Sequence, residues 1–255
     1  MQEKTAIWIV REEGERLAEE LKDGLAEIRD LTLFRPWLAD VKPIDQFRLN
    51  FDKFKSWIFI GTTGIAIRYM QGLLRDKKTD PCLVVIDEGG GFALSLAGGH
   101  EGGGNELAYQ VAAQVQAVPV ITTASESLKP LTVGIGCKKG TKRESIEAAI
   151  RQALGQRALS EIREIATISL KAKEPGLVEF CRLQAIPLRI FKEEDLAPRQ
   201  WLTEKSAHVK KTLGLDGVCE PCALLASPRG KLLVPKSTGV YGVAVAVVED
   251  ERRKP

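Results

Sequence analysis

The segment from Asp87 to Ala108 has the sequence DEGGGFALSLAGGHEGGGNELA, and its interpretation decides how the first half of the chain is understood. Eight of its residues are glycine, and they lie on both sides of His100, which is one of only two histidines in the chain. Glycine permits positive φ and leaves no side chain between the backbone N–H groups and an approaching ligand. An ordinary packed hairpin does not need so many bare backbone positions, so the segment indicates a functional site.

The residues around these glycines predict a strand-to-helix connection. Residues 82–86 form an apolar run typical of a buried strand, and residues 92–96 form a second, shorter one. After Asn105 the apolar residues have helical spacing, so a helix is expected to begin there. A helix N-terminus favours negative charge, and such a junction is the usual place for a ligand in an open α/β sheet.

The rest of the chain repeats this alternation of strands and helices, which predicts an α/β fold. Residues 122–130 are polar and end in proline, which favours a linker. We therefore expect two α/β domains joined by a short linker, at residues 1–125 and 131–255. The other expected strands are residues 5–10, 31–34, 57–60, 118–121, 131–135, 186–191, 231–234 and 241–248. The other expected helices are residues 16–28, 65–74, 144–154, 159–165, 176–184, 207–213 and 221–226.

Composition excludes several classes of protein. The 255 residues are 44% hydrophobic, which is enough for a buried core. The net charge of +3, from 37 basic and 34 acidic residues, gives no sign of nucleic-acid binding. The longest apolar stretch, residues 243–248, is far shorter than the ~20 residues of a membrane span. Five cysteines do not resemble a disulfide framework, and we expect a cytoplasmic protein that binds no membrane.

Two further loops carry glycines between a strand and a helix. The first is Gly61-Thr62-Thr63-Gly64, and the second is residues 136–141, with the sequence GCKKGT. The second loop matches neither a dinucleotide fingerprint, which needs a glycine at position 139, nor a P-loop, which needs lysine where Thr141 stands. Two readings stay open: an anion cradle with two lysines, suited to carboxylates as well as phosphates, or an ordinary turn with solvated lysines.

Two short motifs, His100-Glu101 and a pair of cysteines, have residue types that occur in metal or redox sites. A zincin motif would need a second histidine at position 104, which is glycine, so we expect no protein-bound metal. His100 either acts in catalysis or ligand binding, or merely caps the loop. Cys219-Glu220-Pro221-Cys222 has the spacing of a redox motif, but the interpretation we favour is a helix start with small buried residues.

Taken together, ordered blocks of the sequence resemble the cobalt-precorrin-5A hydrolases, the cobalamin-biosynthesis protein G family of the anaerobic vitamin B12 pathway. The blocks run from about position 50 to the end, and the chain resembles a short form that lacks a middle segment between Thr123 and Leu131. The blocks are residues 61–68, the strand end at Asp87, and residues 96–108, 119–124, 133–141, 170–171, 174–177, 218–224 and 239–246.

The resemblance implies a hydrolase that opens the δ-lactone of a cobalt corrinoid and releases acetaldehyde to give cobalt-precorrin-5B. It implies no cofactor, because the cobalt belongs to the substrate. Such chemistry needs a base, for which His100 is the candidate, with Glu101 as the alternative base or the group that orients it. It also needs oxyanion donors, for which we nominate the amides of Gly98, Gly99, Gly102 and Gly103 near Asn105. The groups expected to grip the acetate and propionate arms are Gly61, Thr62, Thr63, Gly64, Arg68, Gly136, Lys138, Lys139, Gly140 and Thr141.

The chain departs from the family pattern at a few positions. Family members usually have an apolar residue in place of Glu101 and small apolar residues in place of Cys219 and Cys222. His100 and Asn105 fit the pattern better. The partners considered are the cobalt-corrinoid substrate, neighbouring pathway enzymes at hand-over, and a second copy in a homodimer. The alternative function is a non-catalytic carrier or chaperone of corrinoid intermediates, and a sugar- or nucleotide-binding α/β protein is a third.

Overall fold

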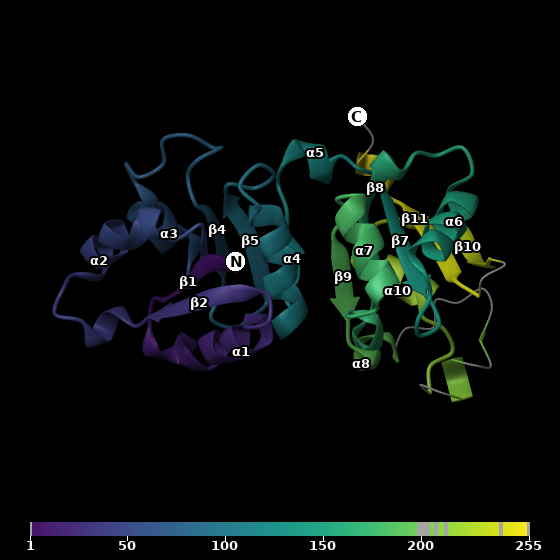
Figure 1. Cartoon of the computed structure of the whole chain (residues 1–255), viewed down its shortest axis with the longest axis horizontal. Coiled ribbons are helices and arrows are strands. Elements are labelled where there is room, and N and C mark those ends of the chain that lie inside the picture. The colour runs from purple at the N-terminus through teal and green to yellow at the C-terminus, as the bar shows by residue number, and fades with distance from the viewer. Residues whose placement is uncertain (1, 198–204, 207–208, 212–213, 240–241, 254–255) are drawn as a thin grey trace. The chain divides into compact units, whose positions relative to one another are not determined.

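The computed structural model of the chain describes residues 2–197, 205–206, 209–211, 214–239 and 242–253. Its backbone contacts divide the chain into two compact units, residues 1–123 and 124–255. Each unit is built around its own mixed β-sheet, flanked by helices (Figure 1). The α/β class expected from the alternating pattern is confirmed.

The first sheet has the strand order β2-β1-β3-β4-β5-β6. The first four strands are parallel, whereas β5 is antiparallel to β4, and β6 is parallel to β5. The β4 and β5 ends are joined by a short turn, which is the connection that antiparallel neighbours permit. The strands are β1 (Glu3–Ile9), β2 (Arg29–Phe34), β3 (Ser56–Ile60), β4 (Cys82–Ile86), β5 (Phe92–Ala97) and β6 (Val118–Val120).

Alternating residues of these strands form two hydrophobic layers. Ile7, Ile58 and Val84 belong to a cluster with helices α1 (Glu15–Leu25) and α4 (Gly104–Val115). Their chain neighbours, among them Trp8 and Trp57, belong to a second cluster with α2 (Pro43–Asn50) and α3 (Thr63–Met70). Because successive side chains of a strand point to opposite faces, these two clusters show that the sheet is covered on both sides.

The second sheet has the order β10-β11-β7-β8-β9, in which β7, β8 and β9 are parallel and β10 and β11 form an antiparallel pair beside β7. Helices α6 and α7 share one hydrophobic cluster with this sheet, and α8 and α10 share the other. The strands are β7 (Leu131–Gly136), β8 (Ile162–Ile168), β9 (Leu188–Phe191), β10 (Lys231–Thr238) and β11 (Ala244–Glu249). The helices are α5 (Ala124–Ser127), α6 (Arg143–Leu154), α7 (Pro175–Leu183), α8 (Glu193–Leu196) and α10 (Cys219–Ala226).

The helix predicted over residues 159–165 is wrong. A short 3-10 turn at Leu159–Glu161 is followed there by strand β8. This strand lies between β7 and β9 and is buried almost throughout, so its sequence shows no alternation of apolar and polar residues. Helix α2 is not among the expected helices. Pro43 occupies its first turn, where proline is tolerated, although proline is also a common signal that a helix is absent.

The short helices α5 and α8 were also not expected, and α5 lies within the expected linker. Other differences are at element ends. β10 extends beyond the expected residues 231–234, and β11 begins at Ala244 rather than at Tyr241, which lies outside the described residues. The helix expected over residues 207–213 falls largely outside the described part of the chain. Further 3-10 turns lie at Glu12–Gly14, Pro36–Leu38, Phe51–Lys53, Ser169–Lys171 and Glu251–Arg253.

Candidate functional site

The glycine-rich loop, residues 98–103, connects β5 to α4. Gly98 and Gly103 have φ values of 63° and 81°, in the left-handed region that favours glycine. The loop closes through two backbone hydrogen bonds, from the N–H of Gly104 to the carbonyl of Gly98 and from Asn105 to Gly99, each 2.9 Å long. These bonds fix the path of the loop at the start of α4.

Close packing also requires the small residues of this loop. A Cβ atom added to Gly98 would lie 2.8 Å from the Cβ of Cys82, and one added to Gly102 would lie 2.8 Å from the carbonyl oxygen of Gly98. The Asn105 side chain donates a 2.9 Å hydrogen bond to the Thr123 hydroxyl, which ties the start of α4 to the segment after β6. The loop is therefore closely packed, and the start of α4 that follows it is held by a hydrogen bond.

The nominated oxyanion donors are backbone amides of this loop. Within the described residues, the backbone N–H groups of Gly98, Gly99, Gly102 and Gly103 donate no hydrogen bond to a backbone or side-chain acceptor. Backbone donors held in a fixed loop can stabilise charge that develops on a substrate oxygen without reorganising. The geometry is thus compatible with an anion or oxyanion site.

His100 and Glu101 lie at the tip of the same loop, and both are exposed. Glu101 forms an ion pair with Lys77, with 3.0 Å between Oε1 and Nζ. Lys77 belongs to the connection between α3 and β4, so the pair joins two neighbouring loops. Glu101 therefore has a bonding partner in addition to any role in orienting His100.

The loop of residues 61–64 lies at the other end of the first sheet. The Gly61 N–H bonds to the carbonyl of Ile86, the last residue of β4, whereas Gly98 packs against Cys82, the first. Four residues of a strand separate these points by about 13 Å. The Thr62 side chain caps α3, and Arg68 lies in the last turn of that helix, away from the cap. The structure therefore does not bring residues 61–64 together with His100. Arg68 lies at the opposite end of α3, from which the chain continues to Lys77, the partner of Glu101.

The first glycine cluster of the quoted segment has a local structural role. The Asp87 carboxylate accepts hydrogen bonds from the N–H groups of Gly91 (3.2 Å) and Phe92 (2.6 Å), which closes the turn between β4 and β5. The neighbouring Glu88 pairs with Arg11, and this contact holds the pKa of the Glu88 carboxyl below its usual value. Glycines 89–91 are thus explained by the turn.

The loop of residues 137–142 follows β7 in the second unit and leads into α6. Gly140 has a φ of 76°, and its N–H donates a 2.7 Å hydrogen bond to Oε1 of Glu174. The Thr141 hydroxyl donates a 2.7 Å bond to the carbonyl of Lys138. Lys138 and Lys139 are exposed. The turn is therefore ordered by internal bonds, and its lysines face solvent.

Sequence reasoning did not single out Glu174 and Lys171 as members of this site. Glu174 is only 6% exposed, and its Oε2 lies 3.4 Å from Nζ of Lys171. Both residues follow β8, whose carboxyl end lies at the same edge of the sheet as that of β7. The sequence places Lys171 and Glu174 just after residues 162–168, so recognising that segment as a strand would have indicated their position. The helix wrongly predicted over residues 159–165 concealed this strand.

Cys219 and Cys222 lie in α10 and are buried. Burial raises the pKa of the Cys219 thiol to about 12 and also raises that of Cys222. Both thiols are therefore protonated near neutral pH, and a protonated thiol is a poor nucleophile and metal ligand. Over the described ranges, no three His, Cys, Asp or Glu side chains are grouped so as to hold a metal ion. The same residues contain no helix long and apolar enough to cross a membrane.

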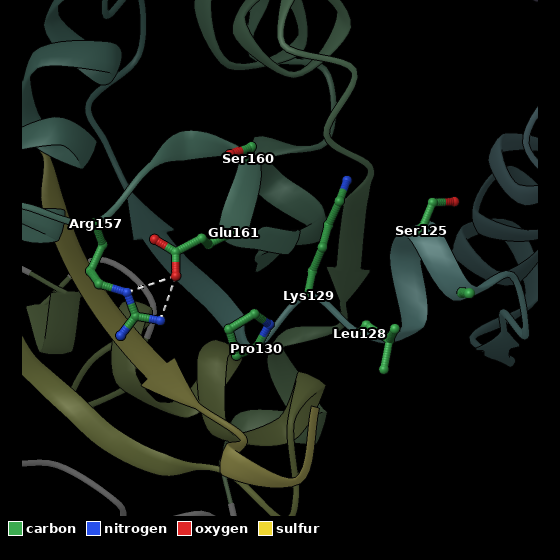
Figure 2. A pocket seen from close by; sticks show the side chains of 8 residues that line it. Ser125, Leu128, Lys129, Pro130, Arg157, Ser160 and Glu161 are labelled. Carbon is green, nitrogen blue, oxygen red and sulfur yellow. Dashed lines mark hydrogen bonds and ion pairs between the residues drawn. The ribbon is translucent and has the colours of Figure 1, made fainter. Parts of the chain in front are cut away.

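An open pocket of about 580 Å³ lies in the second unit, beside the starts of β7 and β8 (Figure 2). Arg157 lines it and pairs with Glu161 and Glu249, each at 2.7 Å. Pro130 and Ser160, which also line it, precede the two strands, so the pocket lies at the opposite edge of the sheet from residues 137–142. It contains none of the expected site residues, and two of its ionic groups, Arg157 and Glu161, are paired with each other.

These features define a class: an α/β protein of two units, each carrying a glycine-bearing strand-to-helix loop with polar groups at its tip. Two family models match it, Cobalamin synthesis G N-terminal over residues 45–126 and Cobalamin synthesis G C-terminus over residues 131–248. The chain belongs to the cobalamin synthesis G family.

The curated relatives have low sequence identity to this chain, but two of the alignments cover most of it. A cobalt-precorrin-5A hydrolase of Priestia megaterium is 26% identical, with 78% of this chain and 80% of that protein aligned. One of Salmonella typhimurium is 26% identical over 73% of this chain and 80% of its own length. Protein CobE of a Sinorhizobium species is 27% identical over 41% of this chain and 70% of its own length. The first alignment extends over 299 residues, more than the 255 of this chain, so that relative contains residues without a counterpart here.

Proposed function

We propose that the chain is a cobalt-precorrin-5A hydrolase, which opens the δ-lactone of the corrinoid and releases acetaldehyde to give cobalt-precorrin-5B. The observation that carries this proposal is the loop of residues 98–103, where four glycine amides without an acceptor in the described part of the chain lie beside His100. The names of the Priestia megaterium and Salmonella typhimurium relatives support the same reaction.

The proposed reaction has two stages. His100 takes a proton from water, and the oxygen of that water adds to the lactone carbonyl. The glycine amides stabilise the resulting oxyanion, which collapses and breaks the ester C–O bond to leave a carboxylate and an alkoxide. In the second stage the carbon–carbon bond to the alkoxide-bearing carbon breaks. The alkoxide becomes the carbonyl of acetaldehyde, and the bonding electron pair passes to the macrocycle.

We assign Glu101 to orienting the histidine rather than to proton transfer. Its carboxylate is engaged by Lys77, and protonation during catalysis would weaken that ion pair. Replacement of Glu101 by glutamine keeps the size of the side chain but removes its charge. We expect a moderate loss of activity from this change, compared with a loss of about 10²-fold or more when the base itself is removed.

The side arms of the substrate require cationic partners elsewhere. Lys138 and Lys139, exposed on the loop with Gly136, Gly140 and Thr141, are suited to carboxylates. Residues 61–64 offer a helix N-terminus for a second carboxylate, at the far end of the first sheet. Cobalt enters with the corrinoid and is not a resident metal.

The test is an anaerobic incubation of the purified protein with cobalt-precorrin-5A, in which acetaldehyde and the product mass are followed. His100→Ala is compared with the wild type, and Lys22→Ala, an exposed change on α1, is the control for substitution itself. Acetaldehyde from the wild type and the control but not from His100→Ala is the expected result. Tight binding without turnover by any form would instead identify a carrier of corrinoid intermediates, and neither binding nor turnover would reject both functions.

A further inference from the structure

Glu174 is a buried carboxylate that the proposed chemistry does not use. It is 6% exposed, and each of its oxygens faces a donor: the Gly140 N–H at 2.7 Å and the Lys171 ammonium at 3.4 Å. Burying a charge is costly unless it is paired and hydrogen-bonded. Its placement between two segments therefore indicates that it holds them together.

The contact fixes the loop of residues 137–142 at Gly140, whose backbone conformation is rare for residues other than glycine. Gly140 is in the left-handed region, and the carboxylate bonds the N–H of this residue. A second attachment lies two residues further along, because a Cβ atom added to Gly176 would be 2.2 Å from the carbonyl oxygen of Thr141. The start of α7 thus supports the loop from one side, and the Thr141 hydroxyl bond to Lys138 closes it from within.

This arrangement limits which groups of the loop are open to an anion, if the loop is the anion cradle that the sequence left as one of two interpretations. A phosphate cradle depends on free backbone amides, and here the protein's own carboxylate occupies the amide of Gly140. The groups that stay exposed are the ammonium ends of Lys138 and Lys139. Lys138 extends toward the turn before β11, with its Nζ 3.8 Å from the Cβ position of Gly242. The loop therefore offers an anionic ligand the ammonium groups of its lysines rather than the amide of Gly140.

We propose that Glu174 is a positioning residue, which fixes this loop so that Lys138 and Lys139 receive the carboxylate side arms of the substrate. The inference rests on the proposed function for the identity of that substrate. It extends the function by naming the residue that sets the shape of the site and the side-chain groups that make the contact.

The test compares Glu174→Ala with Glu174→Gln, because glutamine retains an acceptor for the Gly140 N–H. Turnover is measured as acetaldehyde release, and binding is measured separately by titrating cobalt-precorrin-5A under anaerobic conditions. We expect Glu174→Ala to raise KM and Kd about tenfold with kcat within about twofold, and Glu174→Gln to stay close to wild type. A Lys138→Ala/Lys139→Ala variant should show a similar rise.

A double-mutant cycle distinguishes positioning from general structural damage. If Glu174 acts through the lysines, adding Glu174→Ala to the double lysine variant changes Kd by less than about twofold. Fully additive effects, or an unchanged Kd in Glu174→Ala, would overturn the inference. Should Glu174→Ala fail to fold, Glu174→Asp, which withdraws the carboxylate by one methylene, takes its place in the same cycle. A wild type that binds but does not turn over would reject the hydrolase, while the Kd values would still decide the role of Glu174.

Discussion

Replacing Gly102 with alanine tests whether the glycine-rich loop works through the alignment of its amides. Gly102 has no positive φ, so alanine brings no backbone strain there. Its Cβ would lie 2.8 Å from the carbonyl oxygen of Gly98, whereas ordinary contact begins at 3.4 Å. One of the two backbone segments must therefore move by about 0.6 Å, and neither can yield as a flexible side chain would.

The expected effect on activity is larger than the effect on stability. Overpacking of this kind costs about 1–3 kcal/mol in the free energy of unfolding. A displacement approaching 1 Å at the reacting groups can cost about 10²-fold in rate, so we expect kcat for acetaldehyde release to fall by roughly 30- to 100-fold. Urea denaturation measures the first quantity, and steady-state kinetics at saturating substrate measures the second.

Gly155→Ala is the control variant. It should lower the free energy of unfolding without changing the glycine-rich loop. Gly155 follows α6 with a φ of 60° and open space around its Cβ position, so alanine there is strained but meets no neighbour. We expect a loss of about 1–2 kcal/mol with unchanged kcat. A Gly102→Ala protein that keeps kcat within twofold of wild type would refute the assignment of these amides to the oxyanion.

Three further predictions concern the second unit. Among the five cysteines, half-buried Cys137 should react first with a thiol reagent, and faster at pH 9 than at pH 7 because burial raises its pKa, so Cys137→Ser should abolish the early labelling in a mass spectrum. For Asp250, burial alone would raise the pKa, but hydrogen bonds from Arg229 and a backbone N–H outweigh it and lower the pKa. The carboxylate therefore stabilises the fold above its ordinary pKa of ~3.9, and this stabilisation is lost as pH falls further, so Asp250→Asn should flatten the pH dependence of Tm below pH 5. Gly134→Ala should lower the free energy of unfolding by about 1–3 kcal/mol in chemical denaturation, because its Cβ would lie 1.8 Å from the carbonyl oxygen of Cys219; an unchanged value would contradict the close packing of α10 on β7.

The sequence predicted the α/β class and most elements because their signals are local. Apolar runs such as residues 82–86 coincide with β4, and helical spacing after Asn105 led to α4. The error at β8 arose where a central strand is buried on both faces, because such a strand lacks the alternation that separates strands from helices. That one error also hid Glu174, since its place beside Gly140 follows only from two adjacent parallel strands.

The direction of β5 decides which of the expected site residues can act together. A connection of five residues between Ile86 and Phe92 is too short for a parallel crossover, so β5 must run back along β4. The loop after β5 consequently lies at the amino end of β4, and the loop of residues 61–64 lies at its carboxyl end. Of the two, only the loop after β5 combines amides without a protein acceptor in the described part of the chain with an imidazole. Under the proposed function the reacting carbonyl lies beside His100. A group bound at residues 61–64 is then about a strand's length from the bond that breaks, so substitutions there should change KM and leave kcat near the wild-type value.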